Sequence, residues 1–532
     1  MSTSRQDTLD ARFTRRVGSF TIGTMFSRIT GVLRESVFAH LFGASAATDA
    51  FNVAFRIPNL LRDLFAESAL SAAFVPTLVQ SLRTDKPKDT WLFASTMLNA
   101  LVLTGSLAVL LGVILSPQLV KLIAMGFRGS PWQMNLAVQL TRIMFPFLLF
   151  VMLAAWAMGV LNAGGRFFLP ATAPAAFNLI SAAVPVATYG MFATRGEPIQ
   201  GMAWGVVAGA VAQFLIQLPA LHRLGFCYRP VLNISDLRLR QVFMRWLPML
   251  LGFGTWQVNF LINTFLLTFL QEGSVTWVNY AFRIQHLPAG LFGVAIGSVA
   301  IAEYSHVAVS PNEQLRDRFR HAMNLVSILT LPAALLLMVL AQPLTRLLYE
   351  HGRFTVLDTN ATAGALTLYC LGIWSAAATR NVAAGFYSQG DTRTPAIVAM
   401  IVVGCNILLN LGTMRFLGYL CFPLNSSVTQ TLNFTILYFI LKHRVGNLHG
   451  RSVASLSVRT LCAALAAAGI ALLASDSLTA LPMGRGKPAM ALALLSAGAL
   501  GLAVYYVLCL LLGVSEIKRI IRDTFGASTV QD

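Results

Sequence analysis

Seven arginines lie within stretches of the sequence that are otherwise apolar enough to cross a lipid bilayer. They are Arg28, Arg34, Arg56, Arg62, Arg142, Arg283 and Arg380. A guanidinium keeps its proton when it is buried, and a charge at the bilayer centre costs about 2.5–3.5 kcal/mol. We interpret Arg142 and Arg380 as side chains that snorkel or pair with a carboxylate. The planar fork of a guanidinium matches phosphate oxygens, so a cavity lined by the others would suit a substrate that carries phosphate.

Two of these arginines have an acidic neighbour, in the pairs Arg34–Glu35 and Arg62–Asp63. Adjacent residues point about 100° apart on a helix. Side chains three or four residues apart face each other, whereas direct neighbours do not. We therefore expect these two pairs to be poor local ion pairs, and the ligand to bring the missing negative charge.

No catalytic or metal-binding pattern in the sequence competes with this interpretation. The histidines are dispersed, the six cysteines form no C-x-x-C motif, and no nucleotide-binding or hydrolase motif occurs. Asp63 and Glu67, which are four residues apart, are the only pair in the sequence that could supply the acid–base chemistry of a membrane-embedded enzyme acting on lipid phosphates. We favour a transporter that is not driven by ATP, with such an enzyme second and a passive channel third. No cofactor and no metal is expected.

The composition indicates which elements must position the arginines. Of the 532 residues, 56% are hydrophobic and 11% are charged, whereas soluble domains carry about 25% charged residues. Apolar stretches of about 20 residues, the length that spans a bilayer, recur about fourteen times. They lie at roughly 17–42, 48–79, 91–115, 133–160, 168–192, 200–222, 243–270, 275–306, 320–343, 360–388, 394–415, 418–441, 455–475 and 489–514. The sequence therefore predicts an all-α polytopic membrane protein with about 14 transmembrane helices.

The basic residues predict the orientation of these helices. If the N-terminus is cytoplasmic, the inside loops hold roughly three times as many Lys and Arg as the outside loops, as the positive-inside rule requires. An even number of spans then leaves both termini in the cytoplasm. The net charge of +18 follows mostly from this topology, and because no long basic run occurs, nucleic-acid binding is not expected.

An internal repeat divides the sequence. NVAFRI at residues 52–57 recurs as NYAFRI at residues 279–284. Each copy would hold six spans, an even number, so the copies would be related by a pseudo-two-fold axis along the membrane normal, with a site at their interface. We predict an N-terminal lobe over 1–225, a C-terminal lobe over 226–450, and a helix pair with a cytoplasmic tail over 451–532.

Three stretches resemble a known family. Residues 25–76, which begin MFSRITGVLRESVFAHLFG, closely resemble the start of the MurJ (MviN) family of lipid II flippases. EHGRFT (350–355) and GFYSQGDTRTP (385–395) resemble later signatures of that family. The family belongs to the multidrug/oligosaccharidyl-lipid/polysaccharide exporter superfamily. The resemblance runs over essentially the whole chain.

The resemblance implies a function in the bacterial inner membrane. Such a protein is not an enzyme. It carries lipid II, the undecaprenyl-pyrophosphate-linked peptidoglycan precursor, from the inner to the outer leaflet by alternating access between two six-helix lobes. Two C-terminal helices would hold the polyprenyl tail. Lipid II and membrane lipids are the implied partners, and other cell-wall synthesis proteins are candidates. An exporter of another lipid-linked oligosaccharide, or of drugs, is the alternative.

The resemblance also implies a substrate site. Its residues map onto Ser27, Arg28, Arg34, Asp49, Arg62, Thr276 and Arg283. Some members carry acidic residues close to the last arginine, where this chain has Phe282 and His286. Some members also have a sodium-site aspartate in the seventh span, where this chain offers Gln257, Asn259 and Asn263. Membrane potential, not sodium, is therefore the expected driving force.

Overall fold

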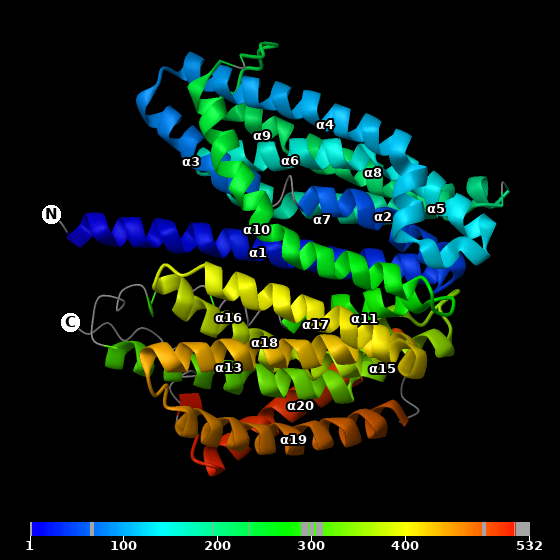
Figure 1. Ribbon diagram of the computed structural model, residues 1–532, viewed down its shortest axis with the longest axis vertical. Helices are drawn as coiled ribbons and strands as arrows, with labels where there is room; N and C mark the ends of the chain where they lie inside the picture. Colours follow the sequence, from blue (N-terminus) through cyan, green and yellow to red (C-terminus); the bar gives the residue numbers. More distant parts are fainter. Residues whose placement is uncertain are drawn as a thin grey trace. The chain divides into compact units, whose positions relative to one another are not determined.

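The chain is built from helices, as a computed structural model shows for residues 3–63, 69–194, 196–233, 235–288, 297, 300, 303–304, 312–480, 486–514 and 516–517. Every regular element in these ranges is an α-helix or a short 3-10 helix (Figure 1). The predicted all-α membrane fold is therefore confirmed. The first helix is longer than the predicted span 17–42, because the polar N-terminal residues continue it back to Thr3.

The helices form two compact units. The first comprises Met1–Thr276 with His351–Phe354, and the second comprises Trp277–Glu350 with Thr355–Asp532. The first unit contains α1 (Thr3–Phe42), α2 (Ala46–Arg62), α3 (Ala69–Thr84), α4 (Pro87–Ile123), α5 (Pro131–Met144), α6 (Pro146–Ala163), α7 (Phe168–Ala193), α8 (Gln200–Leu215), α9 (Leu218–Arg223) and α10 (Leu237–Leu267). The second contains α13 (Asn312–Val339), α14 (Ala341–Tyr349), α15 (Val356–Cys370), α16 (Ile373–Ser388), α17 (Arg393–Leu417), α18 (Cys421–Val445), α19 (Gly450–Ala480) and α20 (Lys487–Leu511). The boundary between the units falls inside α11 (Ser274–Pro288).

Long apolar helices dominate both units. In the described part of the chain, 9 continuous helical segments are long and apolar enough to cross a membrane, and one of them runs over 53 residues from Arg393 to Val445. A segment of that length holds two predicted spans. The predicted spans 48–79 and 275–306 each run partly outside the described ranges. The count of fourteen therefore stays a prediction, as do the lobe boundaries at 225 and 450.

Small residues set the closest helix packing in the first unit, where α7 lies against both α1 and α8. Gly205 and Gly209 lie one turn apart on α8. A Cβ atom at Gly205 would lie 2.7 Å from the Ser181 carbonyl oxygen, and one at Gly209 would lie 2.7 Å from that of Phe177. The two backbones can approach this closely only because neither glycine has a side chain.

Aromatic side chains fill the centre of the same unit. Trp156 on α6 is 1% exposed, and its indole N–H donates to the Ala94 carbonyl oxygen of α4 at 3.1 Å. The rings of Phe74 and Phe93 pack 5.8 Å apart beside them. Because a buried indole N–H needs an acceptor, this bond fixes the rotation of α6 against α4.

The second unit has its own core. Phe319 and Val326 of α13 pack with Phe386 of α16 and Leu441 of α18. The C-terminal helices join this core through α13, because the Tyr505 hydroxyl of α20 donates to the Ile328 carbonyl oxygen at 2.8 Å. The predicted C-terminal helix pair therefore packs on the helices of its own unit.

Candidate functional site

Asp49 and Thr276, which the resemblance placed in the substrate site, meet directly. Asp49 lies in the first turn of α2, four residues after the helix-capping residue Ser45, and is 2% exposed. Its Oδ1 accepts from the Thr276 backbone N–H at 2.9 Å and from the Thr276 hydroxyl at 2.6 Å. Its Oδ2 accepts from the Gly273 N–H at 2.7 Å.

These bonds make Asp49 the N-terminal cap of α11, supplied by another helix. The first N–H groups of a helix lack partners within it, and a carboxylate there also interacts favourably with the helix dipole. Asn52, one turn along α2, adds a bond from its amide to the Thr276 hydroxyl at 3.0 Å. Asp49 and Thr276 therefore fasten α2 to the start of α11, and their polar atoms are engaged with each other.

Arg34 on α1 is already paired with its sequence neighbour. Its Nη2 lies 2.5 Å and its Nε 3.1 Å from Glu35 Oε1. Its guanidinium also lies 5.2 Å from the ring centroid of Phe177 on α7. The side-chain exposures of 12% for Arg34 and 7% for Glu35 show that the pair is largely shielded.

Arg62 repeats this arrangement at the end of α2. Its Nη2 lies 2.7 Å and its Nε 3.1 Å from Asp63 Oδ1. The expectation that adjacent residues pair poorly is wrong at both positions, because a long arginine side chain can fold back along the helix to reach the neighbouring carboxylate.

Gln257 of α10 ties the Arg62 pair to a second arginine. Its Nε2 donates to Asp63 Oδ2 at 2.8 Å, and its Oε1 lies 3.5 Å from Arg56 Nη2. Arg56 also lies over the ring of Phe260, 3.2 Å from the centroid, as in a cation–π contact. Two of the seven intramembrane arginines thus share one polar network between α2 and α10. From the sequence, Gln257 was identified only as a polar residue of the seventh span, where some members of the family carry a sodium-site aspartate, and this network was not predicted.

Ser27 and Arg28 lie in the second half of α1. Ser27 is half-buried, and its carbonyl oxygen accepts from the side chain of Asn178 on α7 at 3.0 Å. Arg28 is exposed, and no described residue forms an ion pair with its guanidinium. Sequence reasoning missed Asn178, although an amide in the apolar run AAFNLI was a signal for a helix–helix contact.

Arg283 lies on the part of α11 that belongs to the second unit, where it is half-buried. The neighbours that replace the family's acidic residues contact each other, with the rings of Phe282 and His286 4.6 Å apart. Phe282 also packs 5.8 Å from the ring of Tyr369 on α15. These two positions therefore hold rings in contact with each other where some members of the family carry carboxylates.

The signature EHGRFT packs against the C-terminal end of α1. The Arg353 N–H donates to the His40 carbonyl oxygen at 3.0 Å, and the rings of His40 and His351 stack 5.2 Å apart. Gly352 has φ +63°, and a Cβ there would collide with the His40 carbonyl oxygen. Only glycine fits this turn without strain.

The signature GFYSQGDTRTP forms the connection between α16 and α17. Asp391 accepts from the Thr394 N–H at 2.9 Å, from the Thr394 hydroxyl at 2.6 Å and from Arg444 Nη1 at 2.5 Å. The bonds from Thr394, followed by the bond and charge of Arg444, hold the pKa of Asp391 well below its usual value. The loop is thus fastened to the end of α18.

Asparagines of α17 form a buried ladder with α18. The Asn425 side chain donates to Asn410 at 2.8 Å, Asn410 donates to Asn406 at 3.1 Å, and Asn406 donates to the Thr429 hydroxyl at 3.2 Å. Among the described residues, no group of three or more His, Cys, Asp or Glu could hold a metal ion. The ladder shows amides that satisfy one another within the unit.

Comparison with known proteins adds the family. A family model described as "Lipid II flippase MurJ" matches residues 38–486. The lipid II flippase MurJ of Burkholderia cenocepacia is 35% identical over 432 residues, which cover 79% of this chain and 82% of that protein. A probable lipid II flippase MurJ of Vibrio cholerae is 34% identical over 511 residues, covering 92% of this chain and 94% of that protein.

Solved structures give the same result. A lipid II flippase MurJ in an inward closed conformation matches with a TM-score of 0.72 and 25% identity, over 95% of this chain and 99% of that one. An inward-facing multidrug transporter of the MATE family, in the MOP superfamily, matches with a TM-score of 0.62 over 82% of this chain and 98% of that one, and at 14% identity it shows the shared fold alone. The chain therefore belongs to the MurJ family of lipid II flippases.

Proposed function

We propose that this protein moves lipid II from the inner to the outer leaflet of the bacterial cytoplasmic membrane, and that its arginines bind the pyrophosphate. The family match and the curated relatives support the transport activity. Ser27, Arg28, Arg34, Arg62 and Arg283 are the proposed substrate-binding residues. Asp49 and Thr276 act by holding α2 against the start of α11, because their polar atoms already bind each other.

The observation that carries the arginine role is the shielded Arg34–Glu35 pair. A buried guanidinium without a counter-ion is expensive, so a carboxylate must neutralise it while the site is empty. A pyrophosphate offers the same bidentate geometry and more charge. Lipid II can therefore displace Glu35 from Arg34, and Glu35 can recover the arginine when the substrate leaves. Arg28, exposed and without an ion pair among the described residues, would make the first contact.

The transport cycle in this proposal uses the two predicted lobes, 1–225 and 226–450, with the helix pair over 451–532 holding the lipid tail. The Asp49–Thr276 bond supports the repeat, since these residues are 227 apart, the same offset as the two AFRI motifs. Residues at equivalent positions of a two-fold repeat can touch only near its axis. Both termini are cytoplasmic in this scheme.

The decisive test measures which leaflet holds lipid II after depletion of the protein from a strain that depends on it. We expect lipid II to collect in the inner leaflet, and plasmid-borne wild type to reverse this. Arg28→Ala should fail to reverse it at wild-type expression, and Arg28→Lys should restore it only in part, because lysine keeps the charge and loses the fork. Arg83→Ala, at an exposed position on α3, is the matched control. Unchanged lipid II distribution after depletion would refute the transport activity, and full rescue by Arg28→Ala would refute the role of that arginine.

A further inference from the structure

An apolar groove runs along the first unit between α4, α6 and α10. It has a volume of about 760 Å³ and is lined by α4, by Met152 of α6 and by the first turns of α10. Its walls include Met97, Leu101, Leu107, Leu111, Val242 and Phe243. Arg240 is the one charged side chain among the described residues that line it.

The groove opens on a face of α4 whose side chains are apolar and exposed. Leu107 is 55% exposed and Leu111 is 48% exposed, and only 17% of the apolar window of α4 is buried within the protein. In a membrane these side chains contact lipid. Apolar cavities of this kind do not retain water, so an acyl chain is the occupant that the walls favour.

The length of the groove fits a chain that crosses one leaflet. From Met97 to Leu111 the wall follows α4, which rises 1.5 Å per residue, so this side is roughly 21 Å long. The hydrocarbon core of a bilayer is about 30 Å thick, and one leaflet is about half of that. A single acyl chain with its glycerol therefore spans a groove of this length.

The contacts of Arg238, two residues before Arg240, show at which end of the groove Arg240 lies. Arg238 binds Asp85 and Asp236 at 2.8 Å each, and its guanidinium lies 4.9 Å from the ring of Phe93. These contacts hold the start of α10 at the start of α4. Arg240 is consequently at the Met97 end of the groove.

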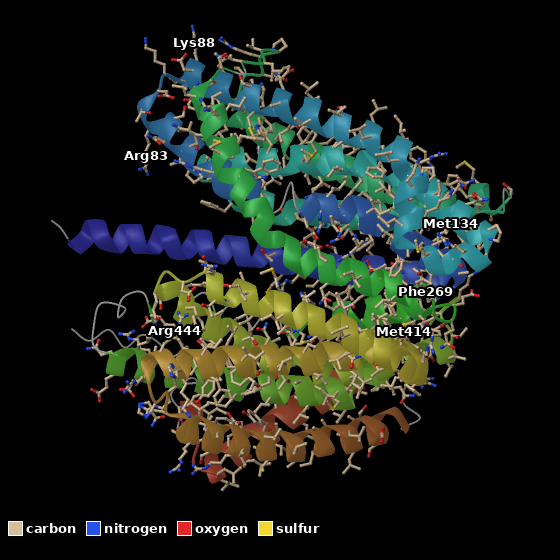
Figure 2. All side chains as sticks on the ribbon, viewed as in Figure 1. Arg83, Lys88, Met134, Phe269, Met414 and Arg444 are labelled. Carbon is tan, nitrogen blue, oxygen red and sulfur yellow. The ribbon has the colours of Figure 1, made fainter. Side chains whose placement is uncertain are left out.

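At that end Arg240 is exposed, and no described residue forms an ion pair with its guanidinium. Arg83 and Lys88 project from the same end of this unit (Figure 2). A row of basic residues at one end of a membrane helix is typical of the cytoplasmic side, where anionic lipids gather. Arg240 differs from the other two in lining the groove itself.

We propose that the groove binds one phospholipid with an anionic headgroup, its phosphate at Arg240 and one acyl chain along α4. The lipid would fill the space between α4, α6 and the start of α10, and so hold α10 in place. This site is not part of the proposed path of lipid II, and the proposal does not depend on that function.

Photo-crosslinking tests the site. The purified protein is placed in nanodiscs that contain phosphatidylglycerol or phosphatidylcholine with a diazirine on one acyl chain, and crosslinked peptides are mapped. We expect crosslinks on residues 97–111 and 239–246, stronger with phosphatidylglycerol. A basic residue near an anionic lipid contributes to the free energy of binding that lipid. Arg240→Ala should therefore reduce the phosphatidylglycerol signal about fivefold. Arg83→Ala, exposed at the same end but outside the groove, should leave it unchanged.

A second variant separates the acyl chain from the headgroup. Ala108 is half-buried in the groove wall, and Ala108→Trp would fill the space. It should abolish crosslinks from both lipids, whereas Arg240→Ala affects the anionic lipid alone. Equal signals for both lipids that survive Arg240→Ala would refute the proposal. So would preferential labelling of these peptides by a diazirine undecaprenyl phosphate, because the groove would then serve the substrate's tail.

Discussion

The cap that Asp49 provides for α11 can be removed with a single atom change, in Asp49→Asn. The asparagine side-chain oxygen can still accept from Thr276, but its amide group then faces the Gly273 N–H, which is also a donor and lay 2.7 Å from the carboxylate. One charge-assisted hydrogen bond is worth about 1.5–3 kcal/mol, and the lost interaction with the helix dipole adds about 0.3–1 kcal/mol. The start of α11 should therefore be destabilised by about 2–4 kcal/mol.

Hydrogen–deuterium exchange in nanodiscs measures this directly. Each 1.4 kcal/mol is a factor of ten, so the peptide that contains Gly273 and Thr276 should lose roughly 30- to 700-fold of its protection if it exchanges by local opening. The control is Thr141→Val on α5, whose hydroxyl binds only the Ala137 carbonyl oxygen of its own helix at 2.7 Å. That variant should change protection little, because such back-bonding adds no helix stability.

The competing explanation makes a different forecast. If Asp49 contacts the substrate instead of capping α11, Asp49→Asn would weaken lipid II binding and leave the exchange of this peptide unaltered. Normal protection in Asp49→Asn, at wild-type expression, would refute the assignment of Asp49 as the cap.

Three further predictions concern the arginine networks, the tail helices and the driving force. Gln257→Leu removes the bond to Asp63 at 2.8 Å, so lipid II binding should weaken in the same direction as in Arg62→Ala; unaltered binding would show that the network does not position Arg62. Truncation after residue 450 should slow flipping in proteoliposomes while the remaining helices stay folded, and a full rate would remove any role for α19 and α20. Collapsing the membrane potential should stop flipping, whereas replacing sodium at constant potential should not; sodium-dependent flipping at zero potential would reverse this conclusion and direct attention to Asn259 and Asn263.

The fold was accessible from the sequence because a bilayer imposes one length and one polarity on every span. The site was accessible only in part. Counting basic residues against topology isolated Arg34 and Arg62, but not their pairing, since that depends on side-chain conformation. The Asp49 bond to Gly273 could not be predicted, because it joins positions 224 apart whose approach depends on packing.

The Arg34–Glu35 and Arg62–Asp63 pairs have an electrical consequence. Each pair moves as a dipole with no net charge, so neither pair would shift gating charge across the membrane when the empty transporter reorients. Arg28, which forms no ion pair with a described residue, would shift charge in that step. A unit charge that crosses the field is worth about 2.3 kcal/mol per 100 mV, so the voltage sensitivity comes from Arg28 in the empty step and from the pyrophosphate in the loaded step. Capacitive recordings on supported membranes should therefore show a transient current that changes when lipid II is added, and Glu35→Gln should enlarge the current of the empty protein because it leaves Arg34 without its carboxylate.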